Sequence, residues 1–298
     1  MLTINPKEIS TAKLHGYMLS AIAPRPICFA STVDKAGKVN LSPYSFFNAF
    51  GSNPSTLIFS PARRVRDNTI KHTLENVYET MEVCINVVNY DMVWQMSLAS
   101  TEYAKGVNEF EKAGFTELPS KMIKAPRVKE SPVQFECKVR EVIETGKEGG
   151  AGNLIVCEIL CMHINQQVLD TDGRIDQQKI RLVARLGQDW YCKAYGDALF
   201  EIEKPLSSLG IGVDALPEKI RNSHILSGND LGRLGNIERL PETEKLTAYV
   251  EQSEIVKELY KRFGHHLESL EYEHHRAIKQ LLHEDNIAEA CLLMLALG

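Results

Sequence analysis

The pattern of apolar and polar positions changes near residue 205 of this 298-residue chain. Before that point, short apolar and β-branched runs alternate with turn residues, which predicts strands joined by tight turns. Strands are expected at 27–33, 56–59, 82–88, 134–144 and 153–168, with a closing segment at 181–194. After it, strand signals vanish and the apolar period becomes helical, most clearly at 242–263, 267–282 and 287–297.

Two domains are therefore expected, 1–204 and 205–298. Short helices are predicted in the first at 9–19, 70–81, 91–100 and 108–113. Strands and helices do not alternate regularly, and turns such as Asp34–Lys38 favour antiparallel pairing. We expect a mainly β fold with helices, an antiparallel barrel, followed by a C-terminal α-helical extension that either packs on the barrel or mediates dimerisation.

A basic stretch, Ser60–Asn76, follows the strand at 56–59 and leads into a predicted helix. Its candidate N-caps are Asp67, Asn68 and Thr69. At about 100° per residue, one polar row beside the apolar stripe contains Arg66, Thr69, Thr73 and Asn76. Backbone amides, the helix dipole and guanidinium groups can together hold a phosphate. An anion site is one interpretation, and a solvated basic loop before an ordinary helix is the other.

Composition and charge restrict the class of protein. The formal net charge of -5 argues against a nucleic-acid-binding surface, so an anion must be bound locally. Neither a signal peptide nor a membrane span is predicted. The seven cysteines are odd in number and contain no Cys-x-x-Cys pair. Most lie in apolar runs, so we expect buried thiols in a cytoplasmic protein.

Metal and nucleotide motifs are weak. Glu271 and His274 have the spacing of a di-iron bundle, but the pair occurs once, so a solvated Glu/His face is favoured. Cys157 and Cys161 are expected to share one strand face, too far apart for a common zinc ion, and are assigned to the core. The glycine-rich segment 146–152 lacks the ending of a phosphate loop and is interpreted as a turn.

Six segments resemble, in order and spacing, the flavin reductase-like proteins with an FMN-binding split barrel, including flavoredoxins. They are Ala23-Pro-Arg-Pro with Ser31-Thr32, Asn40–Phe47, Asn53-Pro54, Phe59-Ser60, Lys71–Asn76 and Val83–Asn86. The resemblance covers roughly residues 20–195. It implies a split barrel and a homodimer, with one FMN per subunit near the dimer interface.

The resemblance also implies which residues contact the cofactor. The isoalloxazine ring and ribityl chain would be lined by Thr32, Ser42, Pro43, Tyr44, Ser45 and Phe46. The phosphate would be surrounded by Ser60, Arg64 or Arg66, Lys71 and Thr73. A late family motif near the flavin is matched by Arg185 to Gly187. His163 stands where several relatives have a histidine near the nicotinamide, a core histidine being the alternative. His72 replaces the aspartate that is usual in the family.

The implied function is an FMN-dependent oxidoreductase that passes hydride from NADH or NADPH through FMN to a free flavin or another acceptor. Hydride transfer to the flavin N5 requires no catalytic acid or base, and the sequence shows no triad or carboxylate pair. Two alternatives remain. One is an FMN-containing electron carrier that serves a redox partner protein without nicotinamide turnover. The other is a cofactor-free binding or assembly module whose function resides in the helical extension.

Overall fold

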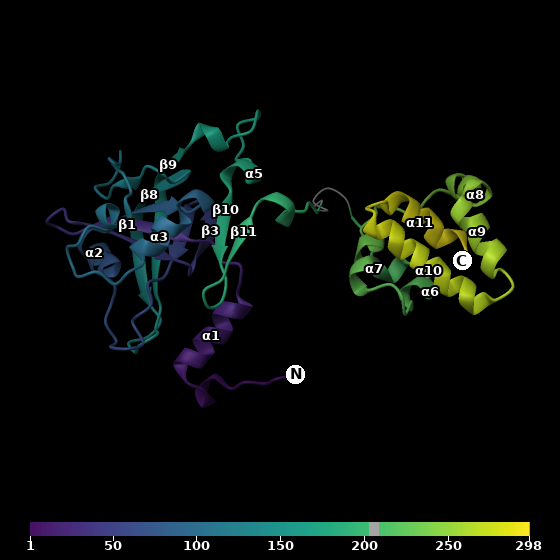
Figure 1. Ribbon diagram of the computed structural model, residues 1–298, viewed down its shortest axis with the longest axis horizontal. Coiled ribbons are helices and arrows are strands. Elements are labelled where there is room, and N and C mark those ends of the chain that lie inside the picture. Colours follow the sequence, from purple (N-terminus) through teal and green to yellow (C-terminus); the bar gives the residue numbers. More distant parts are fainter. Residues whose placement is uncertain (203–208, 298) are drawn as a thin grey trace. The chain divides into compact units, whose positions relative to one another are not determined.

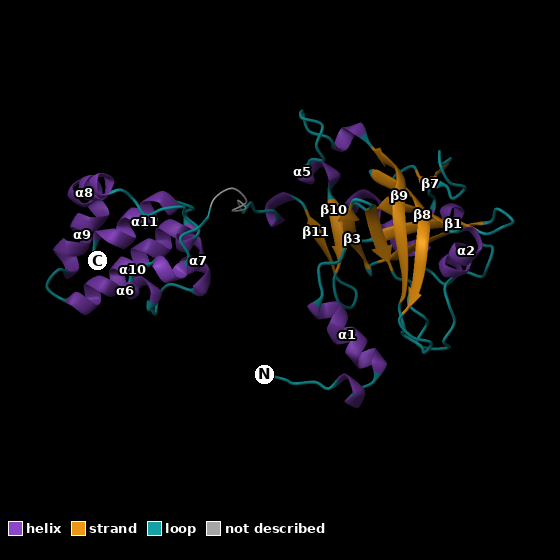
Figure 2. Cartoon of the chain, turned by 180° about the vertical axis from the view of Figure 1, so that it is seen from behind, coloured by secondary structure: helices purple, strands orange, loops and turns teal. Residues whose placement is uncertain are grey.

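The computed structural model describes residues 1–202 and 209–297. The chain divides into two compact units, Met1–Phe200 and Glu201–Gly298. The strands belong to the first unit, and the second is built from helices (Figure 2). The predicted boundary between residues 204 and 205 lies outside the described residues.

A seven-stranded sheet forms the centre of the first unit (Figure 2). Its spatial order is β2-β1-β5-β8-β9-β4-β3, and all neighbours are antiparallel. The strands are β1 (Cys28–Val33), β2 (Val39–Tyr44), β3 (Phe47–Ser52), β4 (Ser55–Phe59), β5 (Glu82–Val87), β8 (Val133–Glu144) and β9 (Asn153–Ile164). The edge strands β2 and β3 are joined by only Ser45 and Phe46, a link of roughly 11 Å at most, so the sheet must curl until its edges meet. The predicted antiparallel barrel is confirmed.

The sheet has apolar clusters on both faces because side chains alternate along each strand. Cys28 and Ala30 of β1 pack inside the barrel, where helix α2 (His72–Thr80) also buries its apolar face. Phe29 points to the other face and packs against α3 (Val93–Ala99) and α4 (Glu109–Ala113). Every residue of β1 is therefore buried.

Shorter elements complete the first unit. They are α1 (Thr11–Ala21), α5 (Gln177–Ile180), β6 (Glu117–Leu118), β7 (Arg127–Val128), β10 (Leu182–Arg185) and β11 (Tyr191–Ala194). The closing segment at 181–194 is a hairpin, β10 paired with β11. The strand predicted to reach residue 168 ends at Ile164, and a 3₁₀ turn over Gln166–Val168 follows it.

The start of α2 corrects the prediction for the basic stretch. The helix begins at His72, its N-cap is Lys71, and no side chain caps it. Asp67 instead closes a turn of its own, accepting from the Thr69 amide at 3.1 Å and hydroxyl at 2.6 Å. Such local side-chain bonding competes with helix formation. The predicted polar row is wrong, because Arg66 and Thr69 precede the helix.

Cys161 is a second correction. The register of β8 with β9 shifts by one residue, so that Cys137 faces Ile159 and Glu136 faces Cys161. A bulge of this kind turns the following side chains to the opposite face of the strand. Cys157 is buried in the barrel core, whereas Cys161 is half-buried on the other face. The two cysteines therefore do not share a face. All seven cysteines are free thiols.

The second unit has its own apolar core, to which each of its described α-helices contributes. Figure 1 shows these helices. They are α6 (Glu218–Arg221), α7 (Gly228–Gly235), α8 (Thr243–Gln252), α9 (Glu254–Phe263), α10 (Leu267–His283) and α11 (Ile287–Ala296). The predicted single helix at 242–263 is two helices, because Ser253 is extended and its hydroxyl caps the Val256 amide. None of the described helices is both long and apolar enough to cross a membrane.

Two histidines of α10 are buried, which corrects the predicted solvated Glu/His face. His274 Nε2 lies 2.7 Å from the Leu293 carbonyl oxygen, and His275 Nδ1 lies 2.8 Å from the Ser223 hydroxyl. Burial lowers the pKa of both imidazoles below the usual 6.5. They serve the packing of α10 against its neighbours, and Glu271 is not bonded to His274.

The second unit should lose stability as the pH falls below about 6.5. Unfolded histidines take up protons there, while the folded His274 and His275 resist protonation, so protonation favours the unfolded state. The thermal midpoint of the helical circular dichroism signal is expected to be lower at pH 5.5 than at pH 7.5. Combined replacement of His274 and His275 by glutamine should flatten this dependence. An unchanged dependence in the folded variant would assign it to other groups.

Candidate anion site

A small cavity lies where β2, the start of α2 and the segment after α3 meet. Its volume is about 30 Å³. It is lined by Asn40, Ser42, Tyr44, Arg64, Lys71, His72, Thr73, Ala99, Ser100, Thr101, Glu102, Tyr103 and Glu109. Alternation along β2 turns Asn40, Ser42 and Tyr44 to this side. Five predicted site residues thus line one cavity: Ser42, Tyr44, Arg64, Lys71 and Thr73.

Three cationic side chains converge beside the cavity on the carboxylate of Glu102. Its Oε1 lies 3.0 Å from Arg64 Nε and 3.5 Å from Lys71 Nζ. Its Oε2 lies 3.1 Å from Arg66 Nη2. Hydrogen bonds from Arg64 and Arg66, together with the charge of Lys71, lower the pKa of Glu102. The cations therefore already hold one anionic group.

The loop before α2 holds Arg64 in place. Its backbone amide donates to the Thr69 carbonyl at 2.9 Å, and its Nη1 donates to the Thr69 hydroxyl and the Ile70 carbonyl at 2.9 and 2.7 Å. The Arg64 side chain is 17% exposed, against 73% for Arg66. Arg63 forms a hydrogen bond elsewhere, since its Nε donates to Asn68 Oδ1 at 2.7 Å. Arg64 is therefore the preorganised cation of the cluster, and Arg66 is a peripheral one.

Beneath the cations, a buried polar chain links β2, α2 and α4. The Tyr44 hydroxyl donates to Thr73 Oγ1 at 2.8 Å, and Thr73 donates to Asn40 Oδ1 at 3.0 Å. Asn40 Nδ2 and the Leu41 amide donate to the two oxygens of Glu109 at 3.0 and 2.9 Å. Burial raises the pKa of Tyr44 to about 12. Thr73 here ties α2 to β2, and its contact with a phosphate stays a prediction.

Three predicted flavin contacts lie outside the lining of this cavity. Thr32 is buried and accepts from Asn76 Nδ2 at 3.1 Å. The Ser60 hydroxyl accepts from the Asn153 amide at 3.0 Å. Pro43 pairs with Phe29 on the opposite face of β2 from Tyr44. In this structure Thr32 and Ser60 stabilise the barrel.

Four other predicted residues gather around the buried Arg25. Its Nε donates to the Ser45 hydroxyl at 3.3 Å, and its Nη2 donates to the Leu186 carbonyl at 2.9 Å, between Arg185 and Gly187. Phe46 meets the His15 ring edge-on, with centroids 6.0 Å apart. A β-carbon at Gly187 would approach Ser20 Oγ to 2.2 Å, so glycine is required there for α1 to pack. These residues form a group distinct from the cavity.

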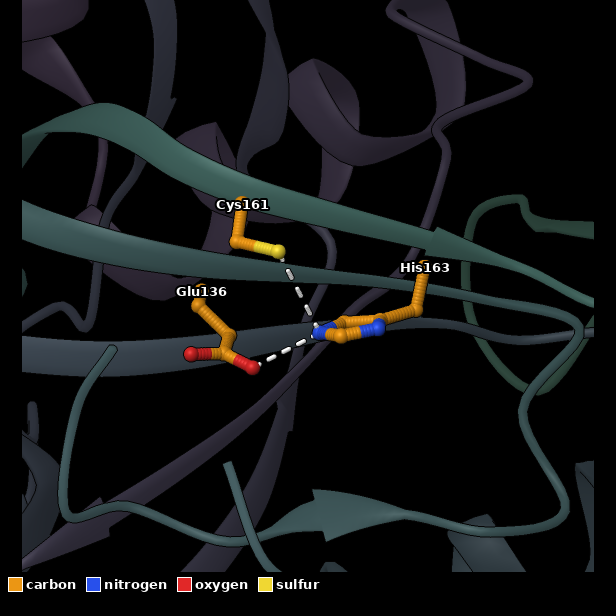
Figure 3. Close-up of side chains that lie close together, drawn as sticks. All are labelled: Glu136, Cys161 and His163. Atoms are coloured by element: carbon orange, nitrogen blue, oxygen red, sulfur yellow. Dashed lines mark hydrogen bonds and ion pairs between the residues drawn. The ribbon is translucent and has the colours of Figure 1, made fainter. Parts of the chain in front are cut away.

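His163 lies elsewhere on the sheet. Its Nε2 is 2.7 Å from Glu136 Oε1 and 3.5 Å from Cys161 Sγ (Figure 3). The bulge in β9 turns Cys161 and His163 to the face opposite the barrel core, where Glu136 of β8 also lies. His163 is neither a lining residue of the cavity nor a core histidine.

Glu102 and Glu109 are not among the predicted site residues, and Asn40 is predicted only as the first residue of a segment that resembles the family. Glu102 is 31 to 38 residues from the side chains that it contacts. Asn40 and Glu109 are 69 residues apart and meet only because α4 covers β2. No local pattern encodes such distant contacts, although a buried glutamate must find partners.

Comparison with known proteins agrees with this fold. A model of the flavin reductase like domain matches residues 19–179. An uncharacterized protein of Aquifex aeolicus is 36% identical over 196 residues, which are 66% of this chain and 97% of the relative. Neither finding extends the match over the whole helical unit.

Two solved structures share the architecture of the first unit. Nitrilotriacetate monooxygenase component B from Bacillus cereus is 28% identical, covers 68% of this chain and 98% of its own, and has a TM-score of 0.63. A protein of Shewanella frigidimarina with a split barrel domain is also 28% identical, covers 68% of this chain and 100% of its own, and has a TM-score of 0.58. The chain therefore belongs to the flavin reductase like domain family, and its first unit is an antiparallel split barrel.

Proposed function

We propose that this protein is an FMN-binding oxidoreductase that passes hydride from NADH or NADPH to a free flavin or another acceptor. The observation that carries the proposal is the convergence of Arg64, Arg66 and Lys71 beside a cavity of the barrel. Membership of the flavin reductase like domain family supports a flavin as the bound group. FMN is proposed over FAD because the cations are suited to a terminal phosphate monoester.

The donor set fits a phosphate group in its chemistry. Three cations (Arg64, Arg66 and Lys71) stand against the carboxylates of Glu102 and Asp67, and a third carboxylate, that of Glu109, also lines the cavity, so an incoming anion meets an excess of positive charge only where it displaces Glu102. The cavity of about 30 Å³ holds about one water molecule, which is too little for a phosphate. The phosphate would therefore take the place of the Glu102 carboxylate. Arg64 and Lys71 would then bind it, and Ser42 would lie nearby.

A bound flavin would supply the hydride chemistry, and the residues of the chain would bind and orient it. Arg64 is preorganised by its loop, so it can fix the phosphate without further ordering. The buried chain from Tyr44 to Glu109 holds β2 against α2, and thus fixes the wall of the cavity.

Steady-state oxidation of NADH and NADPH with added FMN tests the reductase directly. Turnover with either nicotinamide is expected. A protein that binds FMN but does not turn over nicotinamide would be an electron carrier of the flavoredoxin type. A protein that takes up no flavin would favour a cofactor-free module.

Replacing Glu102 with glutamine should strengthen FMN binding about tenfold. The exposed ion pairs that Glu102 makes are each worth roughly 0.2 to 1 kcal/mol, and the phosphate no longer has to displace them. Fluorescence titration measures the dissociation constant, and riboflavin, which lacks the phosphate, should bind both forms equally. Weaker FMN binding by Glu102→Gln would instead make Glu102 an organiser of the cations.

We also propose a homodimer. Leu160, Met162 and Ile164 recur at every second position of β9 and are 39%, 44% and 37% exposed. An exposed apolar stripe of this kind favours association with another surface. Sedimentation equilibrium is expected to give twice the mass of the chain, and Met162→Glu should shift the protein toward the monomer. A monomeric wild-type protein would contradict the proposal.

A further inference from the structure

We propose that Glu136, Cys161 and His163 form a binding site for a divalent transition-metal ion of the Zn²⁺ class. The three side chains come from the paired strands β8 and β9 and point toward one another (Figure 3). Their ligand atoms all lie within 4.8 Å of one another. Among the described residues, this is the one group of three or more His, Cys, Asp and Glu side chains that satisfies that spacing. The proposal is independent of the proposed flavin chemistry.

The β-bulge creates the cluster. Without it, Cys161 would follow Cys157 and Ile159 into the barrel core, away from Glu136. The register shift opposite Glu136 brings Cys161, and His163 two residues later, to the face that carries Glu136. Bulges commonly re-aim side chains in this way at functional sites. Two ligands from β9 and one from β8 are thus held on a paired segment of backbone.

Without a metal ion, Glu136 and Cys161 compete for one ring nitrogen of His163. Glu136 Oε1 and Cys161 Sγ both approach the same ring nitrogen of His163, at 2.7 and 3.5 Å. A neutral imidazole nitrogen has either one proton or one lone pair, so it can satisfy only one of them well. A metal ion placed between the three atoms would satisfy all of them.

One of the two hydrogen-bond distances in the cluster already suits a tetrahedral ion, and the other must lengthen. With Zn–N and Zn–O bonds of about 2.05 Å and a Zn–S bond of about 2.3 Å, S···N should be about 3.5 Å and N···O about 3.3 Å. The observed Sγ···Nε2 separation is 3.5 Å. The observed Nε2···Oε1 separation is 2.7 Å, so those two atoms must open by about 0.6 Å on binding. Rotation of the half-buried His163 is sufficient for that change.

The charge and the surroundings also fit a dication. A thiolate, a carboxylate and a neutral imidazole carry a combined charge of −2, which balances Zn²⁺. Glu136 is fully buried, and its carboxylate accepts from the Lys121 amide at 2.8 Å and the Met122 amide at 2.6 Å. Burial alone would raise the pKa of Glu136, but these bonds and His163 hold it below its usual value. Such outer contacts orient metal ligands.

One charge opposes the site, since Arg127 Nε lies 3.9 Å from Glu136 Oε1. The Arg127 guanidinium donates to the Pro119 carbonyl at 3.0 and 3.2 Å, so these hydrogen bonds are directed to a backbone carbonyl and not to the Glu136 carboxylate. Three protein ligands leave a fourth position for water, as in zinc sites that are open to solvent. The His163 side chain is 16% exposed, which gives the ion a path of entry.

Thiol reactivity tests the site without an activity assay. Five of the seven cysteines are buried, and only Cys161 and Cys192 are half-buried. The Cys192→Ala variant of the full chain should therefore present one thiol, Cys161, to a disulfide reagent in the native state. One equivalent of Zn²⁺ is expected to slow that reaction at least about tenfold, because the thiolate becomes a ligand. Co²⁺ should give a sulfur-to-cobalt charge-transfer band and four-coordinate visible bands.

Matched variants decide the outcome. His163→Gln in the Cys192→Ala background should restore the thiol reaction in the presence of Zn²⁺, and Cys161→Ser should remove the charge-transfer band. Circular dichroism checks that each variant is folded. A thiol reaction unaffected by equimolar Zn²⁺ would overturn the proposal. So would a charge-transfer band that persists in the folded Cys161→Ser variant, because another cysteine would then be the ligand.

Discussion

Replacing Arg64 and Lys71 together with alanine is expected to weaken FMN binding at least about 100-fold. Each charge-assisted contact with a phosphate contributes roughly 1.5 to 3 kcal/mol, and 1.4 kcal/mol corresponds to a factor of ten. Arg64 and Lys71 are the two cations that line the cavity, and both are less exposed than Arg66. Titration of flavin fluorescence measures the loss, and the riboflavin affinity should change much less.

The matched control removes one arginine and one lysine from the helical unit. Lys257 and Arg276 each form an exposed ion pair with a glutamate on the same helix. Their combined replacement by alanine changes the net charge by the same amount and should leave FMN binding unchanged. If Arg64→Ala with Lys71→Ala retains the wild-type affinity in a folded protein, the phosphate is bound elsewhere. Equal losses in the control would indicate a general charge effect instead.

Glu109→Ala is expected to destabilise the first unit by about 3 kcal/mol, since two hydrogen bonds to a charged acceptor are lost. The Glu109 carboxylate is 5% exposed and accepts from Asn40 and from the Leu41 amide. Its removal leaves both donors buried without a partner, which is costlier than the loss of the bonds alone. The midpoint of urea unfolding, followed by near-ultraviolet circular dichroism of the aromatic side chains, measures the effect.

Glu109→Gln separates the hydrogen bond from the charge. Glutamine keeps one acceptor oxygen in a side chain of similar shape. Glu109→Gln should therefore lower the free energy of unfolding by about half as much as Glu109→Ala. A loss of less than about 1 kcal/mol for Glu109→Ala would show that water replaces the carboxylate. The chain from Tyr44 to Glu109 would then not be what fixes β2 against α2.

The strands were predictable because their signal is local. Short apolar and β-branched runs between turn residues located β1, β4, β5, β8 and β9. The start of α2 was predicted too early, because the turn at Asp67 uses the side chain that was expected to cap the helix. Because the Asp67 side chain can either close a turn or cap a helix, the sequence alone does not show which of the two forms.

The bulge in β9 was not predictable for a different reason. The sequence predicts one continuous strand over residues 153–168, and only the pairing with β8 shows that one residue is extra. The consequence is large, since Cys161 moves from the core to a cluster with Glu136 and His163. The resemblance pointed to Arg64 and Lys71, which line one cavity, but it did not reveal Glu102, whose contacts depend on the tertiary fold.

The central claim is most directly tested by an absorbance spectrum of the purified full-length protein, reconstituted with FMN and freed of excess cofactor. The spectrum is recorded before and after anaerobic addition of NADH and, separately, of NADPH. The account predicts a protein-bound flavin spectrum with one FMN per chain, and bleaching of its visible band by at least one of the nicotinamides. A protein that retains no flavin, or a bound flavin that stays oxidised with both nicotinamides, would contradict the proposed reductase.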